Sequence, residues 1–382
     1  MSRVSARPLA DSIILAYLGD SHGALHSVCV RGEVDYVLEV DGSKRSGSGT
    51  VLRLSVALSA IRGEDLHIYN IRKKRDRPGL RPQHLEAVLT AAKLCGAEVK
   101  GARVDSEELW FRPRRIVGGL VEANIGTAGS IPMLLLAILP ICTHAERTVQ
   151  IHVTSGGTDV THAPTINYLK HVFLPTLTRM GMSFSLEVNK YGYYPKGMGE
   201  VTLTNHPQKE ISPIKMVEFG SLEEVHGISV CTFLRNARVA ERQAEAARRS
   251  IEAKGLRADI QVVYDESNRQ QKGSSLALWA LTDEGVILGG DAIGEIGKPS
   301  EVVGDEAAKN LFVELDSKAT VDVHLADMLV PYVALAKGES VYLTRSLTEH
   351  LETNIWLAQE ILGTEFRIDK IDDLHQISSG GC

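Results

Sequence analysis

One order of segments occurs twice in this chain of 382 residues, at an offset of about 80 residues. The order is a strand, a Gly-rich turn, a helix, a strand, a second helix and two further strands. The first copy is predicted at 36–40, 51–61, 66–71, 82–94, 97–104 and 108–112. The second copy is predicted at 120–125, 132–143, 148–153, 164–180, 183–188 and 200–204. Since such a unit cannot bury its apolar face alone, the duplication predicts a large domain assembled from repeats.

A third, partial copy is predicted near the C-terminus, with segments at 322–335, 340–344, 350–362 and 365–371. The preceding stretch of about 110 residues has a different pattern, with strands and helices at 226–233, 237–254, 259–264, 275–281, 285–288 and 301–315. Its polar stretch 265–273 is expected to be a mobile loop. The sequence therefore predicts an α/β (α+β) protein with a smaller inserted domain of four strands and two helices. The expected divisions are an N-terminal appendage, two repeats, the insert and the last repeat, at 1–33, 34–205, 206–317 and 318–382.

The overall charge excludes a general attraction to anionic partners. The chain carries 42 Lys and Arg against 48 Asp and Glu, for a formal charge of −6, so any anionic ligand needs a local basic patch. Its five cysteines are scattered without metal-binding spacing, which is typical of a reducing compartment. The most apolar stretch, 131–142, is too short to cross a bilayer. A cytoplasmic protein with no membrane partner is therefore expected.

Six basic residues in ten form the strongest local charge feature, between a predicted strand and a predicted helix, offset only by Asp76: Arg72, Lys73, Lys74, Arg75, Arg77 and Arg81. Arginines around the rigid Pro78-Gly79 pair suit bidentate contacts with phosphate. A run of charges is equally often a solvated face, and both interpretations stay open. The Gly-rich turn 41–50 is a weak signal, because it matches neither a P-loop nor a dinucleotide fingerprint.

Two of the 13 histidines stand in informative places. His84 follows Gln83 at a predicted helix start beside the basic run, and His350 lies where a loop enters a helix. A neutral imidazole at such a position can act as a nucleophile towards phosphorus, although histidines there are more often structural. The residues alone thus indicate an enzyme or binding protein for a phosphate-bearing ligand of unknown identity.

Several short segments, taken together and in order, resemble the RNA 3′-terminal phosphate cyclase family. They lie at 41–53, 70–72, 78–84, 126–130, 156–159, 163–164, 194–197, 239–243, 290–294, 325–327 and 350–354. The resemblance spans about 36–371 and implies three βαβαββ-like repeats with an inserted small domain. It also implies an ATP-dependent ligase-class enzyme that requires Mg²⁺ or Mn²⁺ and acts on RNA with a 3′-phosphate end.

The resemblance implies three nucleotidyl-transfer steps. A histidine attacks the α-phosphorus of ATP and forms histidyl-AMP, with release of pyrophosphate. AMP then moves to the RNA 3′-phosphate, and the neighbouring ribose O2′ attacks the activated phosphate and expels AMP. The product is a 2′,3′-cyclic phosphodiester. The number of subunits stays open, a homodimer being one option.

The family's functional residues fall on particular positions of this chain. The catalytic nucleophile falls on His350 and the adenylate-site aspartate on Asp327. The same resemblance assigns ATP binding to the residues around Asp327 and to one residue of the second repeat, namely His324, Leu325, Ala326, Met328 and Leu136. It assigns the RNA end or the ATP phosphates to Arg53, Arg72, Arg75, Gln83 and His84.

Other positions depart from the family pattern. Ser46 stands where the family has a glutamate expected to help hold the metal, so the metal ligands stay unknown. Thr50, Leu136 and Met328 replace family glutamines, and Asn167 replaces an aspartate. An alternative is therefore a catalytically weak or inactive cyclase-like factor that binds RNA or serves ribosome biogenesis. Retention of His350 and Asp327 favours the enzyme.

Overall fold

The repeated unit builds sheets of one strand order. The computed structural model describes residues 6–8 and 36–381. In the first repeat the sheet order is β2 (Tyr36–Asp41), β3 (Asp65–Tyr69), β5 (Leu109–Arg112) and β4 (Glu98–Lys100). In the second it is β6 (Gly119–Asn124), β7 (Val149–Gly156), β9 (Gly199–His206) and β8 (Ser183–Lys190). The first two strands of each sheet are parallel and the other pairs antiparallel, so the duplication seen in the sequence is a structural duplication.

The third repeat is complete, and its first strand lies before the insert. Its sheet order is β10 (Lys215–Met216), β15 (Ser340–Thr344), β17 (Leu374–Ser379) and β16 (Phe366–Ile371). β10 pairs in parallel with β15, although it falls within the range 206–317 that the sequence assigned to the insert. The sequence also missed β17, whose polar residues His375, Gln376 and Ser378 give a weak strand pattern.

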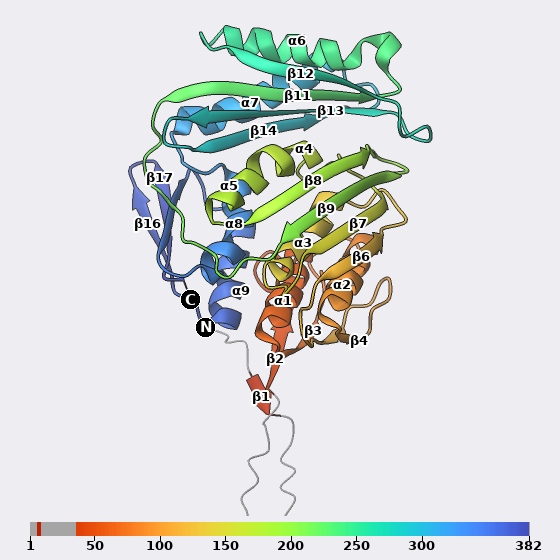
Figure 1. The fold of residues 1–382 in the computed structure, drawn as a ribbon, viewed down its shortest axis with the longest axis vertical. Coiled ribbons are helices and arrows are strands. Elements are labelled where there is room, and N and C mark those ends of the chain that lie inside the picture. The colour runs from red at the N-terminus through yellow and green to blue at the C-terminus, as the bar shows by residue number, and fades with distance from the viewer. Residues whose placement is uncertain (1–5, 9–35, 382) are drawn as a thin grey trace, which may run out of the picture.

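The helices of the repeats pack against one another between the sheets (Figure 1). They are α1 (Gly49–Arg62), α2 (Pro82–Cys95), α3 (Ile131–Cys142), α8 (Val323–Leu335) and α9 (Glu349–Leu362). The predicted helix at 164–180 is divided into α4 (Ile166–Tyr168), a π-helical turn (Leu169–Phe173) and α5 (Leu174–Arg179). Pro175 has no N–H to donate to the preceding turn, which is consistent with the widened helix before it.

The inserted domain forms a separate layer with its own core (Figure 1). Its elements are β11 (Leu222–Thr232), a 3₁₀ turn (Arg235–Ala237), α6 (Val239–Glu252), β12 (Ala258–Asp265), β13 (Gly273–Thr282), β14 (Ile287–Ile293) and α7 (Ser300–Ser317). The sheet order is β12-β11-β13-β14. The strand predicted at 285–288 is longer and later, because Gly289 and Gly290 weaken its pattern. A Cβ at Gly290 would lie 2.4 Å from the backbone nitrogen of Leu311, so α7 packs directly on this strand.

These elements confirm the predicted α/β fold with a small inserted domain of four strands and two helices. Of the expected appendage 1–33, only β1 (Ala6–Pro8) is described, and it pairs antiparallel with β2. The other residues of that segment lie outside the described part of the chain. Within the described part, none of the helices has the length and apolar character needed to cross a membrane.

Candidate active site

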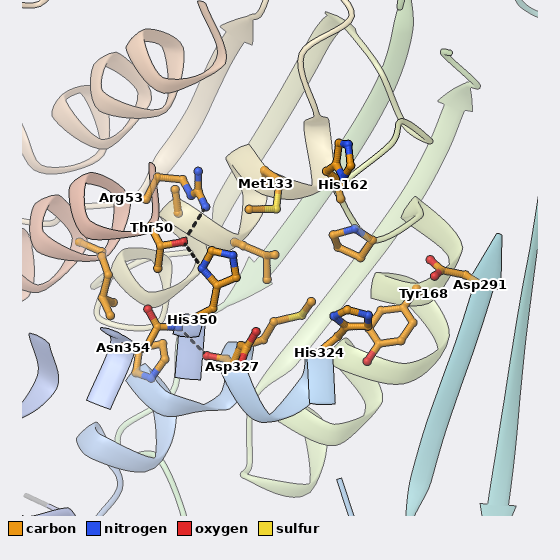
Figure 2. Close-up of a pocket in the computed structure, with 18 residues that line it drawn as sticks. Thr50, Arg53, Met133, His162, Tyr168, Asp291, His324, Asp327, His350 and Asn354 are labelled. Atoms are coloured by element: carbon orange, nitrogen blue, oxygen red, sulfur yellow. Dashed lines mark hydrogen bonds between the residues drawn. The ribbon is translucent and has the colours of Figure 1, made fainter. Parts of the chain in front are cut away.

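A pocket of about 490 Å³ lies where helices of all three repeats meet. Its wall is formed by α1, α3, α8 and α9, by the segment before α4, and by β14 of the inserted domain (Figure 2). The side chains brought together come from distant parts of the sequence, and include Thr50, Arg53, Leu136, His324, Asp327, Met328 and His350. The pocket therefore contains most of the residues that the family resemblance assigned to nucleotide binding.

His350 lies in the first turn of α9 and faces the pocket (Figure 2). Thr348 caps this helix, because its hydroxyl accepts the backbone N–H of Leu351 at 3.0 Å. Nδ1 of His350 lies 3.2 Å from Oγ1 of Thr50, and that oxygen also accepts a hydrogen bond from the Arg53 guanidinium at 3.3 Å. A hydroxyl oxygen has two lone pairs, so Thr50 can accept from both groups. In that arrangement Nδ1 carries the proton and Nε2 has the free lone pair.

The surroundings of His350 keep its imidazole neutral. Burial lowers the pKa of His350, and the positive charges of Arg53 and Arg75 lower it further. Burial also lowers the pKa of Arg53 to about 10, with a smaller effect from Arg72, so Arg53 stays positive at neutral pH. A neutral imidazole beside a fixed positive charge suits nucleophilic attack on an anionic phosphate.

Asp327 connects α8 to the start of α9. Its carboxylate accepts the hydroxyl of Thr348, and its carbonyl oxygen accepts the amide of Asn354 at 2.8 Å. Burial raises the pKa of Asp327 to about 7, although the Thr348 hydrogen bond acts against the rise. The residue that caps α9 and the pocket aspartate are thus held as one unit.

Helical periodicity separates the predicted ATP-binding residues that lie on α8. His324 and Met328 line the pocket with Asp327, because residues three and four apart share one face of α8. Leu325 and Ala326 are buried in the core on the other side of that helix. Leu136 lines the pocket from α3.

The basic run is only partly a solvated face, because several of its members hold their own loop. Arg72 has a positive φ of 57°, and its guanidinium donates to the carbonyl oxygens of Arg77 at 2.7 Å and Gly79 at 2.9 Å. Lys73 forms an ion pair with Glu107, and Arg81 forms one with Asp105. The ammonium group of Lys74 donates to the carbonyl oxygen of Arg45. Among the described residues Arg75 has no ion-pair partner, and it lies close enough to His350 to lower its pKa.

His84 and Gln83 occupy the first turn of α2, outside the pocket wall. Nδ1 of His84 accepts the backbone N–H of Arg81 at 3.3 Å, so the ring proton is on Nε2. Burial lowers the pKa of His84 well below its usual value, and Arg53, Arg72 and Arg81 add to the effect. A Cβ at Gly49 would lie 2.2 Å from Nε2 of His84, so only glycine fits there.

Gln83 joins the first repeat to the second. Its side-chain oxygen accepts the backbone N–H of Ser130 at 2.8 Å. Ser130 in turn caps α3, since its hydroxyl accepts the N–H of Met133. This amide therefore positions the start of a helix that lines the pocket.

The described residues do not form a protein-held metal site. Ser46 is 6% exposed, its hydroxyl is bonded to that of Ser48 at 3.0 Å, and its N–H is bonded to Thr353. Within residues 6–8 and 36–381, no group of three or more His, Cys, Asp or Glu could hold a metal ion.

Some pocket residues were not assigned a role from the sequence, among them Met133, His162, Tyr168, Asp291 and Asn354. Asp291 accepts the backbone N–H of Thr165 at 2.7 Å, and burial raises its pKa. Asp291 and Asn354 lie in the segments 290–294 and 350–354 that matched the family. The family match could therefore have identified Asp291 and Asn354 from the sequence as residues of the site.

The chain is similar to known proteins over most of its length. The family model described as RNA 3′-terminal phosphate cyclase matches residues 44–368. A protein of that name from Pyrobaculum aerophilum is 44% identical over 329 residues, covering 86% of this chain and 94% of the relative. The proteins of that name from Methanopyrus kandleri and Pyrococcus abyssi are 42% and 43% identical, each covering 87% of this chain and 95% of the relative.

Proposed function

The chain belongs to the RNA 3′-terminal phosphate cyclase family, and from this membership we propose that it converts an RNA 3′-terminal phosphate to a 2′,3′-cyclic phosphodiester with ATP. The family membership confirms the resemblance inferred from the sequence. The proposed reaction is an ATP-dependent nucleotidyl transfer with histidyl-AMP and an adenylylated RNA end as intermediates.

The orientation of His350 is the structural observation that supports the histidyl-AMP step of this proposal. Nδ1 faces the Thr50 hydroxyl and the lowered pKa keeps the ring neutral, so Nε2 is available to form a bond to the α-phosphorus of ATP. As that bond forms, the bond from the α-phosphorus to the pyrophosphate oxygen breaks. Thr50 keeps hold of the Nδ1 proton, which supports the positive charge that develops on the ring.

Three groups near His350 suit the anionic RNA end. Arg53 supplies a fixed positive charge on the pocket wall, and the Nε2–H of His84 supplies a neutral donor beside it. Arg75 adds an exposed guanidinium whose positive charge acts on the nucleophile. Such donors would hold the 3′-phosphate while AMP moves from His350 to it and while the ribose O2′ then displaces AMP.

The test is incubation of the protein with α-labelled ATP and Mg²⁺ or Mn²⁺. We expect protein-bound AMP that is acid-labile and alkali-stable, and we expect His350→Ala to abolish it. His206→Ala, which changes an exposed histidine at the end of β9, is the matched control and should label normally. Undiminished labelling of His350→Ala would refute the assignment. Absence of label with any nucleotide or metal, together with retained binding of 3′-phosphorylated RNA, would favour the cyclase-like binding factor.

A further inference from the structure

Loops of two domains meet at one edge of the molecule, where β8 joins β9 and β12 joins β13 (Figure 1). Gln271 binds the turn of the second repeat twice, since its oxygen accepts the N–H of Lys196 at 3.2 Å and its amide donates to the carbonyl of Tyr194 at 3.0 Å. Asn268 is 1% exposed and donates to the carbonyls of Tyr191 and Gly197. The polar loop expected to be mobile is therefore anchored on the large domain.

This junction presents an aromatic ring and unpaired cations. Tyr194 is 77% exposed, and Lys196, Arg269 and Lys272 are exposed beside it. None of these three cations has an ion-pair partner among the described residues, whereas Arg242 of the same inserted domain is paired with Glu301. We call these four residues the Tyr194 surface. In a chain of net charge −6, unpaired cations around an open aromatic ring suit a single-stranded nucleic acid, whose bases stack and whose phosphates need positive charge.

The loop that carries Tyr194 is connected through backbone hydrogen bonds to the start of α3, a helix that lines the pocket. The N–H of Thr158 donates to the carbonyl of Gly192 in this loop at 2.8 Å, and the N–H of Ile131 in α3 donates to the carbonyl of Gly157 at 2.9 Å. A Cβ at Gly197 of the same loop would lie 2.9 Å from the Cα of Ala128, so the loop packs directly on the turn before α3. A strand whose 3′ end enters the pocket can reach it within a few nucleotides.

We propose that the Tyr194 surface binds the RNA strand a few nucleotides on the 5′ side of the reacting end, an inference that rests on the proposed function. Tyr194 stacks on a base, and Lys196, Arg269 and Lys272 contact phosphates. Stacking and phosphate contacts do not read base edges, so the surface favours longer strands without favouring a sequence.

The experiment compares a 3′-phosphorylated dinucleotide with a 3′-phosphorylated decanucleotide, with affinity measured by fluorescence competition. We expect Tyr194→Ala to weaken decanucleotide binding about tenfold and to leave dinucleotide binding unchanged. Tyr194→Phe keeps the ring and should bind both as the parent does. Combining Lys196→Ala, Arg269→Ala and Lys272→Ala should lower the salt dependence of decanucleotide binding by about 0.7 for each lost phosphate contact.

Lys309→Ala, an exposed lysine on α7, is the matched control and should change neither affinity. Equal effects of Tyr194→Ala on both oligonucleotides, or no effect on either, would overturn the inference. Labelling with α-labelled ATP in the absence of RNA tests the cyclase reaction independently of RNA binding by the Tyr194 surface. If the parent protein is not labelled, the cyclase reaction is refuted. The dependence of binding on oligonucleotide length would still test whether the Tyr194 surface binds the RNA strand.

Discussion

The hydroxyl oxygen of Thr50 lies 3.2 Å from Nδ1 of His350, which joins α1 of the first repeat to α9 of the third. Thr50 makes this contact from the first turn of α1. The contact fixes which ring nitrogen faces the pocket. Thr50 is thus a positioning residue for the proposed nucleophile.

Removing the Thr50 hydroxyl should slow AMP transfer to His350. Thr50→Val keeps the shape but offers no acceptor to Nδ1, so the ring loses its preferred tautomer and orientation. We expect the rate constant for labelling by α-labelled ATP to fall about 10- to 100-fold, on the order of 1–3 kcal/mol, with little change in the ATP concentration needed for half-saturation. Thr50→Ser should restore most of the rate. Equal losses in both variants would contradict a role through the hydroxyl.

The protonation of His350 should depend on Arg75. A nearby positive charge disfavours the imidazolium, and Arg75 is one of the charges that lower the pKa of His350. We therefore expect a titration midpoint below 6.5 in the parent, and a midpoint closer to 6.5 in Arg75→Ala. NMR titration of histidine-labelled protein measures both, with His350→Gln identifying the resonance. A midpoint at or above 6.5 in the parent would contradict the neutral nucleophile.

The sequence predicted the repeated elements because each is a long apolar or alternating segment bounded by turn residues. The segments 36–40, 51–61 and 82–94 correspond to β2, α1 and α2 with shifts of one or two residues at their ends. β10 has only two residues and no pattern of its own, so only its pairing with the distant β15 identifies it. Such elements depend on long-range contacts that periodicity does not encode.

The candidate site was predictable in its residue types but not in its contacts. The family match assigned roles in one site to His350, Asp327 and Arg53, and all three line the pocket of the structure. The contact of Thr50 with His350 spans 300 positions and has no local signal. The same holds for Asn268, whose polar neighbours predict a free loop although its own side chain is buried against another domain.

Asp327→Asn should stabilise the fold at alkaline pH while it impairs nucleotide transfer. The pKa of Asp327 is raised to about 7 in the folded protein and is about 3.9 when unfolded. The folded state therefore binds the extra proton between these values, and stability falls as the pH rises through this window. Asparagine stays neutral and still offers an oxygen to Thr348. We expect the variant to be more stable by about 1–3 kcal/mol at pH 8 and nearly equal to the parent at pH 4, as measured by urea unfolding. If Asp327→Asn is less stable than the parent at pH 8, burial of the ionised carboxylate does not destabilise the folded protein.

Substitution of Arg72 should lower the stability of the fold, whereas substitution of Arg75 should affect RNA binding and leave stability unchanged. Arg72 donates to the carbonyl oxygens of Arg77 and Gly79, so Arg72→Ala should loosen the loop and lower the free energy of unfolding by about 1–2 kcal/mol, besides weakening RNA binding. Arg75 has no such internal bonds among the described residues and is exposed. Arg75→Ala should therefore leave stability unchanged and lower the salt dependence of binding to a 3′-phosphorylated oligonucleotide by about 0.7.

Lys100→Ala, which removes an exposed charge on β4 of the same repeat, is the control for charge alone and should bind the oligonucleotide as the parent does. Urea unfolding and salt titrations of affinity on the three variants separate the two effects, because loss of a loop contact changes unfolding and loss of a phosphate contact changes the salt slope. If Arg75→Ala binds with the affinity and salt slope of the parent, its guanidinium does not touch the RNA. If Arg72→Ala unfolds as the parent does, the two carbonyl contacts do not hold the loop, and Arg72 acts on the RNA directly.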